Sequence, residues 1–188
     1  MISIRVAKAS DGADLARIYA PYVEATPITF EYVPPSAEEF SERIAAKMEK
    51  YPFIVAKDGE RIVAYAYASS FRERVAFGWT AELSVYVDKA CHGQGIGKRL
   101  YRALIELLSL QGFASCVGTV VPPNEASEAL HTSLGFTLVG TMKDVGFKLG
   151  KWHDMMIFEK RISSSTAPSE IIPFSQMDEE KINAILNA

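Results

Sequence analysis

The chain has 188 residues, of which 48% are hydrophobic and 23% are charged, and its formal net charge is −3. This length suits one substantial core, the acidic balance argues against general nucleic-acid binding, and no window reaches the roughly 20 apolar residues of a membrane span. Because Cys91 and Cys116 lack zinc-site spacing and the N-terminus has no apolar signal core, we expect a cytoplasmic protein without a metal and without nucleic-acid or membrane partners.

Residues 3–67 carry the patterns of three strands and two helices. Ser36 and Glu39 have the spacing of a capping box, which satisfies two backbone amides at a helix start. Asp58-Gly59 lies between two apolar runs and favours a β-hairpin. In chain order we expect a strand at 3–7, a helix at 11–23, a helix at 36–49 and hairpin strands at 53–57 and 61–67.

Residues 79–160 alternate between strand and helix patterns. Leu100, Leu104 and Leu107 have helical spacing, and Gly112 is a typical residue for ending that helix. Asn124 can cap a further helix. We expect a strand at 79–87, a helix at 98–112, a strand at 116–121, a helix at 124–134, and strands at 136–141 and 155–160.

The composition changes after Arg161. The stretch "SSSTAPSE" is typical of a linker, and "MDEEKINAILNA" places Ile182, Ile185 and Leu186 at helical spacing. We therefore divide the chain into a domain at 1–162 and a linker with a short C-terminal helix at 163–188. That helix docks on this chain or on a partner subunit, and a disordered tail is the alternative.

Three alternating glycines, in "CHGQGIGKRL", separate a strand from the helix that follows it. Successive amides at a helix N-terminus bind phosphate oxygens, and missing Cβ atoms at Gly93, Gly95 and Gly97 let those oxygens come close. Lys98 adds a positive charge. A tight turn is the structural alternative, but it needs one or two glycines rather than three. The spacing fits neither a Walker A loop nor a dinucleotide fingerprint.

This stretch resembles the pyrophosphate loop of the GCN5-related N-acetyltransferases (GNAT), [R/Q]xxGx[G/A]. Gly95-Ile96-Gly97 fills the pattern, although His92 stands where Arg or Gln is usual. "VPPNEAS" and "LHTSLGF" resemble later segments of that family. "TFEYVPPSAEEF" and "GFKLGKWHDMMIFEK" are similar to its phosphinothricin and methionine sulfoximine acetyltransferase group. The resemblance covers residues 2–161.

The resemblance implies an α/β (α+β) fold with a mixed, mostly antiparallel sheet flanked by helices and splayed between strands 4 and 5. It implies acetyl-CoA as cosubstrate, held through the backbone of the fourth strand, the glycine loop and the two helices that follow. A bulge near Leu83–Ser84 would offer an amide to the thioester carbonyl. The implied cofactor contacts are Val85, Tyr86, Val87, Gly93, Gln94, Gly95, Ile96, Gly97, Lys98, Asn124 and Ser133.

Acetyl transfer from a thioester to an amine needs a neutral nucleophile and a proton for the departing thiolate. Glu82, in an otherwise apolar strand, corresponds to the family's proposed general base; alternatively it is an exposed or ion-paired carboxylate. His131 is a candidate acid, as a His there has been assigned a catalytic role in the group, or a structural residue. Tyr101 is a second candidate acid, or a helix-packing residue.

A small amino-acid acceptor needs its carboxylate bound, which a planar guanidinium does through two hydrogen bonds. Arg74 is the first candidate and Arg72 the second, and surface solvation is the alternative for both. Thr29–Glu31, Trp79 and Trp152-His153 are candidate pocket walls or lid packing. The predicted acceptor-binding residues are Phe30, Phe71, Arg72, Arg74, Glu82, Leu83 and Ser84.

With these candidate residues, the resemblance implies an N-acetyltransferase for an acceptor of the phosphinothricin, methionine sulfoximine or methionine sulfone type, and it also implies a homodimer. A protein N-terminus, a polyamine or an antibiotic is the alternative acceptor. A non-catalytic acyl-CoA-binding module is the remote alternative, which Glu82 and His131 argue against.

Overall fold

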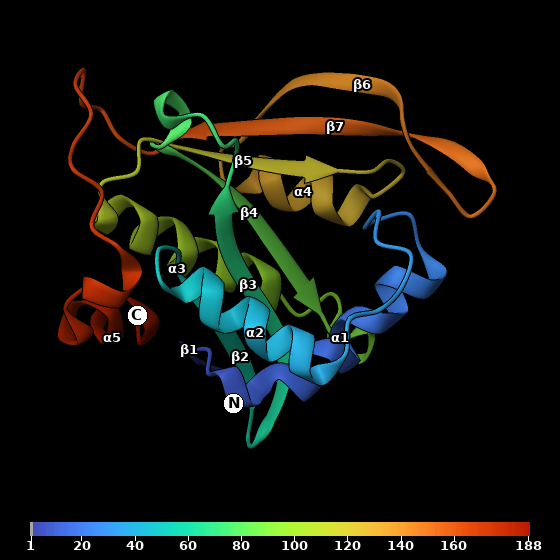
Figure 1. The fold of residues 1–188 in the computed structure, drawn as a ribbon, viewed down its shortest axis with the longest axis horizontal. Coiled ribbons are helices and arrows are strands. Elements are labelled where there is room, and N and C mark those ends of the chain that lie inside the picture. Colours follow the sequence, from blue (N-terminus) through green and yellow to red (C-terminus); the bar gives the residue numbers. More distant parts are fainter. Residues whose placement is uncertain (1) are drawn as a thin grey trace.

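The computed structural model describes residues 2–188 and contains one seven-stranded sheet in the order β1-β2-β3-β4-β5-β7-β6 (Figure 1). The strands are β1 (Ile2–Val6), β2 (Phe53–Asp58), β3 (Arg61–Ser70), β4 (Thr80–Val87), β5 (Ser115–Val120), β6 (Thr137–Lys148) and β7 (Lys151–Arg161). The helices are α1 (Gly12–Ala25), α2 (Ala37–Met48), α3 (Ile96–Gln111), α4 (Glu125–Ser133) and α5 (Glu179–Leu186). Between residues 2 and 188, none of the helices combines the length and the apolar composition of a membrane span.

All neighbouring strands are antiparallel except β4 and β5, which confirms the mixed, mostly antiparallel sheet. This parallel pair is short. Only residues 80–82 of β4 pair with residues 115–117 of β5, although β4 continues to Val87. The two strands therefore separate beyond Glu82, as the predicted splay requires, and leave one backbone edge of β4 free for a ligand.

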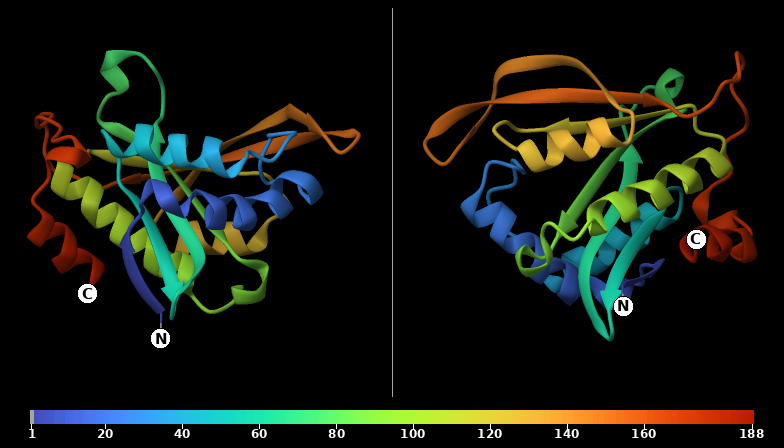
Figure 2. Two further views of the ribbon diagram at one scale, coloured as in Figure 1. Left: turned by 60° about the horizontal axis from the view of Figure 1, so that its bottom comes forward. Right: turned by 180° about the vertical axis from the view of Figure 1, so that it is seen from behind.

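Different helices cover the two faces of the sheet (Figure 2), and each face carries its own apolar core. Helices α1 and α2 cover one face, where Tyr65 and Phe53 pack with Leu15 and Ile44. Helix α3 covers the other face, and Leu104 packs there with side chains of β2, β3 and β4. Adjacent residues of a strand face opposite sides, so Glu82 and Leu83 project toward different helices.

The hairpin of β6 and β7 is longer than the sequence predicts. The expected strands at 136–141 and 155–160 are observed as Thr137–Lys148 and Lys151–Arg161, joined at Leu149-Gly150. The register shifts between Leu138 and Gly140 and again between Met142 and Gly146. These irregularities hide the alternation that marks a strand in sequence.

The C-terminal segment folds back on its own chain. Phe174, Ile182 and Leu186 are buried in the core that surrounds α3. The buried Gln111 amide of α3 donates to the carbonyls of Lys50 (2.8 Å) and Ile172 (2.7 Å) and so holds the segment in place. The predicted terminal helix is present as α5 and docks on this chain.

Candidate active site

A cleft of about 500 Å³ opens where β4 and β5 separate. Its walls come from the free half of β4, the loop before α3, the start of α3 and one side of α4. The predicted cofactor residues Lys98, Asn124 and Ser133 all line it, together with Val85, Val87, Gly93, Gln94, Gly95, Ile96 and Gly97. The predicted Tyr86 does not line the cleft; its ring points to the other face and packs edge-on against Tyr19 and Tyr22.

The glycine loop forms one end of this cleft. Gly93 (φ +75°) and Gly95 (φ +73°) adopt the left-handed conformation, and no atom lies within 4 Å of where a Cβ would be on either. Helix α3 begins directly afterwards, at Ile96, two residues earlier than expected. The first amides of a helix have no intrahelical acceptor, so this corner suits a phosphate oxygen. The residues present therefore fit the diphosphate of a coenzyme A thioester.

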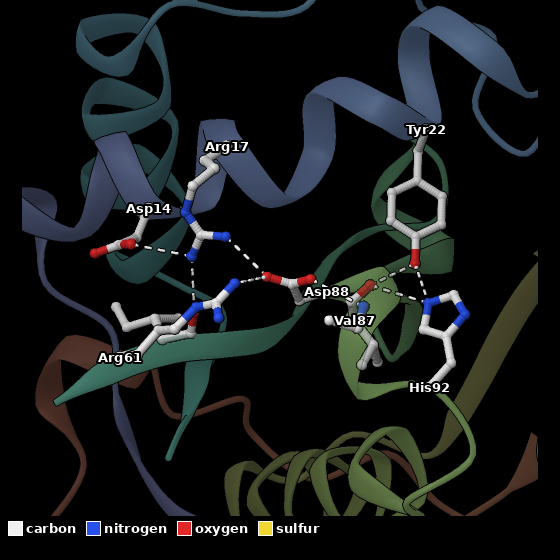
Figure 3. A network of polar contacts seen from close by, with 9 residues as sticks. Asp14, Arg17, Tyr22, Arg61, Val87, Asp88 and His92 are labelled. Atoms are coloured by element: carbon white, nitrogen blue, oxygen red, sulfur yellow. Dashed lines mark hydrogen bonds and ion pairs between the residues drawn. The ribbon is translucent and has the colours of Figure 1, made fainter. Parts of the chain in front are cut away.

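A hydrogen-bonded cluster supports the loop from the α1 side (Figure 3). The Tyr22 hydroxyl donates to the Val87 carbonyl (2.6 Å) and lies 2.9 Å from His92 Nε2. His92 Nε2 is also 3.1 Å from the Val87 carbonyl. His92 therefore joins the loop to the end of β4. Tyr22 was missed in the sequence, where its helical spacing indicates only core packing.

Asp88 fixes the same turn through two guanidinium groups (Figure 3). Its carboxylate accepts hydrogen bonds from Arg17 (2.8 Å) and Arg61 (2.6 Å). The pKa of Asp88 is lowered, since these contacts and the Ala90 amide outweigh the effect of burial. The cluster anchors the end of β4 on α1 and β3.

The free edge of β4 presents the backbone of its odd-numbered residues. The Asp88 amide donates to the Val63 carbonyl of β3 (2.7 Å). The backbone N–H and C=O groups of the even-numbered residues of β4 therefore point toward β3, and those of Leu83, Val85 and Val87 point toward the free edge. The expected bulge near Leu83–Ser84 is absent. The register with β3 runs unbroken from Val87 to Ala81, and the opening arises where β4 stops pairing with β5.

Glu82 lies at the last paired position of β4, where the cleft begins. Its side chain is half-buried and accepts a hydrogen bond from the Thr119 hydroxyl of β5 (3.1 Å). Burial raises the pKa of Glu82, while Thr119 and the positive charges of Lys47 and Arg72 oppose that rise. A carboxylate with a raised pKa at the point where two strands separate is suited to proton transfer, although Glu82 itself is not among the residues that line the cleft.

Tyr101 and His131 are buried together behind Leu83 and do not line the cleft. The Tyr101 hydroxyl donates to the Leu83 carbonyl (3.2 Å) and lies 3.5 Å from His131 Nε2. His131 Nδ1 lies 2.8 Å from the Ser127 carbonyl, so the neutral ring carries its proton on Nδ1 and leaves Nε2 facing Tyr101. Burial lowers the pKa of His131 and raises that of Tyr101.

Phe71 and Arg72 lie on the β3–β4 loop and are not among the residues that line the cleft. The Arg72 guanidinium lies 5.0 Å from the centre of the Phe71 ring and close enough to influence the Glu82 carboxylate. Arg74 is exposed on the same loop and makes no side-chain hydrogen bond or ion pair within residues 2–188. Trp79 points elsewhere, because its indole donates to the Ser169 carbonyl of the C-terminal segment (2.6 Å).

The loop at 26–35 packs against the tip of the β6–β7 hairpin. The Phe30 ring covers Gly146, and its centre is 6.5 Å from that of His153. The buried Lys148 donates to the Thr29 carbonyl (2.6 Å). Of the expected pocket walls, Phe30 and His153 therefore come together, whereas Trp152 is exposed and packs edge-on against Phe147.

The domain family described as acetyltransferase (GNAT) domain matches residues 4–157. The chain belongs to the GNAT acetyltransferases. It is 32% identical over 176 residues to the phosphinothricin N-acetyltransferase of Streptomyces viridochromogenes, covering 94% of this chain and 96% of that protein. It is 34% identical to the L-methionine sulfoximine/L-methionine sulfone acetyltransferase of Salmonella typhimurium, over 66% of this chain and 72% of the other.

Solved GNAT structures share the fold. The phosphinothricin acetyltransferase of Sinorhizobium meliloti, solved in complex with acetyl-CoA, superposes with a TM-score of 0.87 at 34% identity, over 93% of this chain and 97% of that one. This GNAT protein is therefore an N-acetyltransferase by family. Within residues 2–188, no three His, Cys, Asp or Glu side chains are grouped as a metal site.

Proposed function

We propose that this GNAT enzyme transfers the acetyl group of acetyl-CoA to the amino group of a small amino-acid-like acceptor, of the phosphinothricin, methionine sulfoximine or methionine sulfone type. The observation that carries the proposal is the arrangement along β4. The glycine loop, which lines the cleft, follows one end of its free edge, and Glu82 lies at the other end, at the last position that pairs with β5. Acetyl-CoA supplies the acetyl group, activated as a thioester.

In this proposal the glycine loop holds the diphosphate of the cosubstrate through the amides of residues 93–97, and the Lys98 ammonium adds a positive charge. The cleft-facing backbone of Val85 and Val87 pairs with the amides of the pantetheine arm. Asn124 and Ser133 contact the arm from α4. The Asn124 side chain also caps that helix by accepting from the Ser127 amide (3.2 Å), so its position is fixed before any ligand binds.

Glu82 acts as the general base, directly or through one water. Its raised pKa brings the carboxylate closer to the pKa of the proton donor, which favours proton transfer between them. The acceptor nitrogen loses a proton to Glu82 as its bond to the acetyl carbon forms. The carbon–sulfur bond breaks, and the thiolate takes up one proton.

Of the two predicted acids, which both lie outside the lining of the cleft, Tyr101 is the better candidate for supplying that proton. Burial keeps the phenol protonated and lowers the pKa of His131, so the imidazole is neutral and is a poor acid. Its Nε2 lies 3.5 Å from the Tyr101 hydroxyl, which donates its proton to the Leu83 carbonyl. The contact of the Tyr101 hydroxyl with Leu83 O sets it against the β4 backbone.

The acceptor side of the proposal rests on charge. Arg72 lies within the electrostatic reach of Glu82, and Arg74 lies two residues further along the same loop. Cations at this position favour an acceptor with a carboxylate over a polyamine, which like-charge repulsion would exclude. A protein N-terminus remains the alternative acceptor.

The proposal includes a homodimer in the cytoplasm. The hairpin exposes several large apolar side chains together, with Val139 59%, Trp152 59% and Leu149 55% exposed, which marks an interaction surface. Cys91 and Cys116 are free thiols, which suits a reducing compartment.

The test is a thiol-release assay with acetyl-CoA against methionine sulfoximine, methionine sulfone, phosphinothricin, free methionine, spermidine and an alanine-terminated peptide. Turnover confined to the first three acceptors is the expected result. Turnover of the peptide or spermidine alone would overturn the acceptor class, and release from none of them would overturn the function.

A further inference from the structure

A second, smaller pocket of about 240 Å³ lies on the α2 face of the sheet, beside Glu82. Its walls come from α1, α2, β2, β3 and the loop at 26–35. The lining residues are Tyr19, Glu31, Phe40, Arg43, Lys47, Phe53, Tyr65 and Tyr67. Tyr67 pairs in register with Ser84, two residues from Glu82 on the same face of β4, so the pocket and the carboxylate share one surface.

Two of the three charged groups in this pocket neutralise each other. The Arg43 guanidinium makes two hydrogen bonds to Glu31, at 2.8 Å and 3.1 Å. Glu31 also accepts from the Tyr19 hydroxyl (3.0 Å). This paired arrangement leaves the Glu31 carboxylate engaged on both oxygens and Arg43 without a free fork for a ligand.

Lys47 is the unpaired charge. Its Nζ lies 4.8 Å from the centre of the Tyr67 ring, and it makes no hydrogen bond or ion pair with any residue from 2 to 188. The side chain is half-buried. Burial lowers the pKa of Lys47, and Arg43 adds to this, while Glu82 opposes it. An ammonium withdrawn from water in this way gains most when an anion arrives to pair with it.

We propose that this pocket receives the side chain of the acceptor and that Lys47 pairs with a negatively charged oxygen at its tip. This assignment rests on the proposed function and deepens it. With the acceptor nitrogen at Glu82, the methylene groups lie along the aromatic walls of Phe40, Phe53 and Tyr65. The preferred acceptors are α-amino acids whose side chain ends in a phosphinate or carboxylate, and Lys47 determines this specificity.

Phosphinothricin and methionine sulfone form a matched pair for the test. Both carry two methylenes and a methyl group on a tetrahedral centre with two oxygens, but the phosphinate is an anion and the sulfone is neutral. The measurement is kcat/KM for each acceptor at saturating acetyl-CoA. In Lys47→Met the preference for phosphinothricin over the sulfone should fall about 10- to 100-fold, the loss of one charge-assisted hydrogen bond.

Two further variants control this measurement. Lys47→Arg keeps the charge and should retain the preference for the anion. Lys50→Met removes a neighbouring exposed lysine that also lies over an aromatic ring, Tyr51 at 5.4 Å, and should leave both acceptors unchanged. The thermal midpoint of each variant shows that the fold is intact.

The outcomes distinguish the proposed function from the role assigned to Lys47. No turnover of any amino acid by the unaltered enzyme would overturn the proposed function and this assignment with it. An active enzyme in which Lys47→Met lowers kcat/KM equally for both acceptors, with the acid limb of the pH profile moved upward, would overturn the assignment alone. Lys47 would then act by adjusting the pKa of Glu82.

Discussion

The imidazole of His131 occupies the space in which a side chain at position 118 would begin. A Cβ on Gly118 would lie 2.1 Å from His131 Nε2, and the ring is held between Phe158 and Phe136 with centre separations of 5.2 Å. The absence of a side chain in the middle of β5 is therefore what allows α4 to pack with His131 facing Tyr101.

Gly118→Ala should therefore destabilise the protein by about 1–3 kcal/mol, as overpacking of a filled core does. Urea unfolding measures this directly. Gly140→Ala is the matched control, because no atom lies within 4 Å of a Cβ at that strand position, and its stability should stay within about 0.5 kcal/mol. An unchanged midpoint in Gly118→Ala would show that the imidazole moves freely.

Glu82→Gln should lower kcat by about 100-fold or more, because an amide cannot take up the proton of the acceptor amine. The thiol-release assay with acetyl-CoA and the most active acceptor measures this fall in kcat. The variant should still bind acetyl-CoA. A rate within a few-fold of the unaltered enzyme would remove Glu82 from the chemistry.

The pH profile tests Thr119. Its hydroxyl donates to the ionised Glu82 and lowers the pKa of that carboxyl, so Thr119→Val should raise the pKa further. The acid limb of kcat/KM should then move to higher pH by about one unit, the size expected for a hydrogen bond to a charged group. Thr137→Val, at an exposed strand position away from Glu82, should leave the limb in place. A shift in the opposite direction would contradict the sign.

Gly95→Ala tests the glycine loop. The left-handed backbone is strained for alanine, and the added methyl group would project into open space beside the amides that are proposed to bind phosphate oxygens. The KM for acetyl-CoA should rise about tenfold or more, the value of a charge-assisted hydrogen bond. Gly59→Ala has a similar φ (+57°) and open space in the β2–β3 turn, so it should lose stability without a change in KM. Equal KM values in the two variants would count against phosphate binding at the loop.

Tyr22→Phe removes the hydroxyl that joins β4 to His92. With Val87 and His92 less firmly held, the KM for acetyl-CoA should rise about three- to tenfold while kcat changes little, as for one neutral hydrogen bond. Tyr32→Phe, whose hydroxyl donates to Phe147 O away from the cleft, is the matched control. A normal KM in Tyr22→Phe would limit this cluster to a structural role.

Much of the fold is predictable because its signals are local. The capping box at Ser36 and Glu39 forms both of its hydrogen bonds, at 3.2 Å and 2.7 Å, and α2 follows. The glycine loop also carries its own signal, since one of the three alternating glycines, Gly95, caps α3 in a left-handed conformation that glycine adopts readily. Resemblance to the family adds the splay of β4, which no residue pattern reveals.

The side chains that complete the site are less predictable. Lys47 and Tyr22 lie on helices where the sequence indicates only a solvated or a packed face, and their approach to β3 and β4 depends on tertiary packing. Trp79 is aromatic and adjacent to β4, yet the C-terminal segment takes its indole hydrogen bond. Arg74 is exposed on the same loop as Arg72. The sequence could not predict this, because residue type does not determine the direction of a loop side chain.

The contacts of Thr29 with Lys148 and of Phe30 with Gly146 also bear on the order in which the chain can fold while it is being synthesised. Strands β1–β4 and the glycine loop leave the ribosome early. The tip of the β6–β7 hairpin, against which the loop at 26–35 packs, emerges much later. The loop at 26–35 can therefore make these contacts only after the last hairpin has been synthesised.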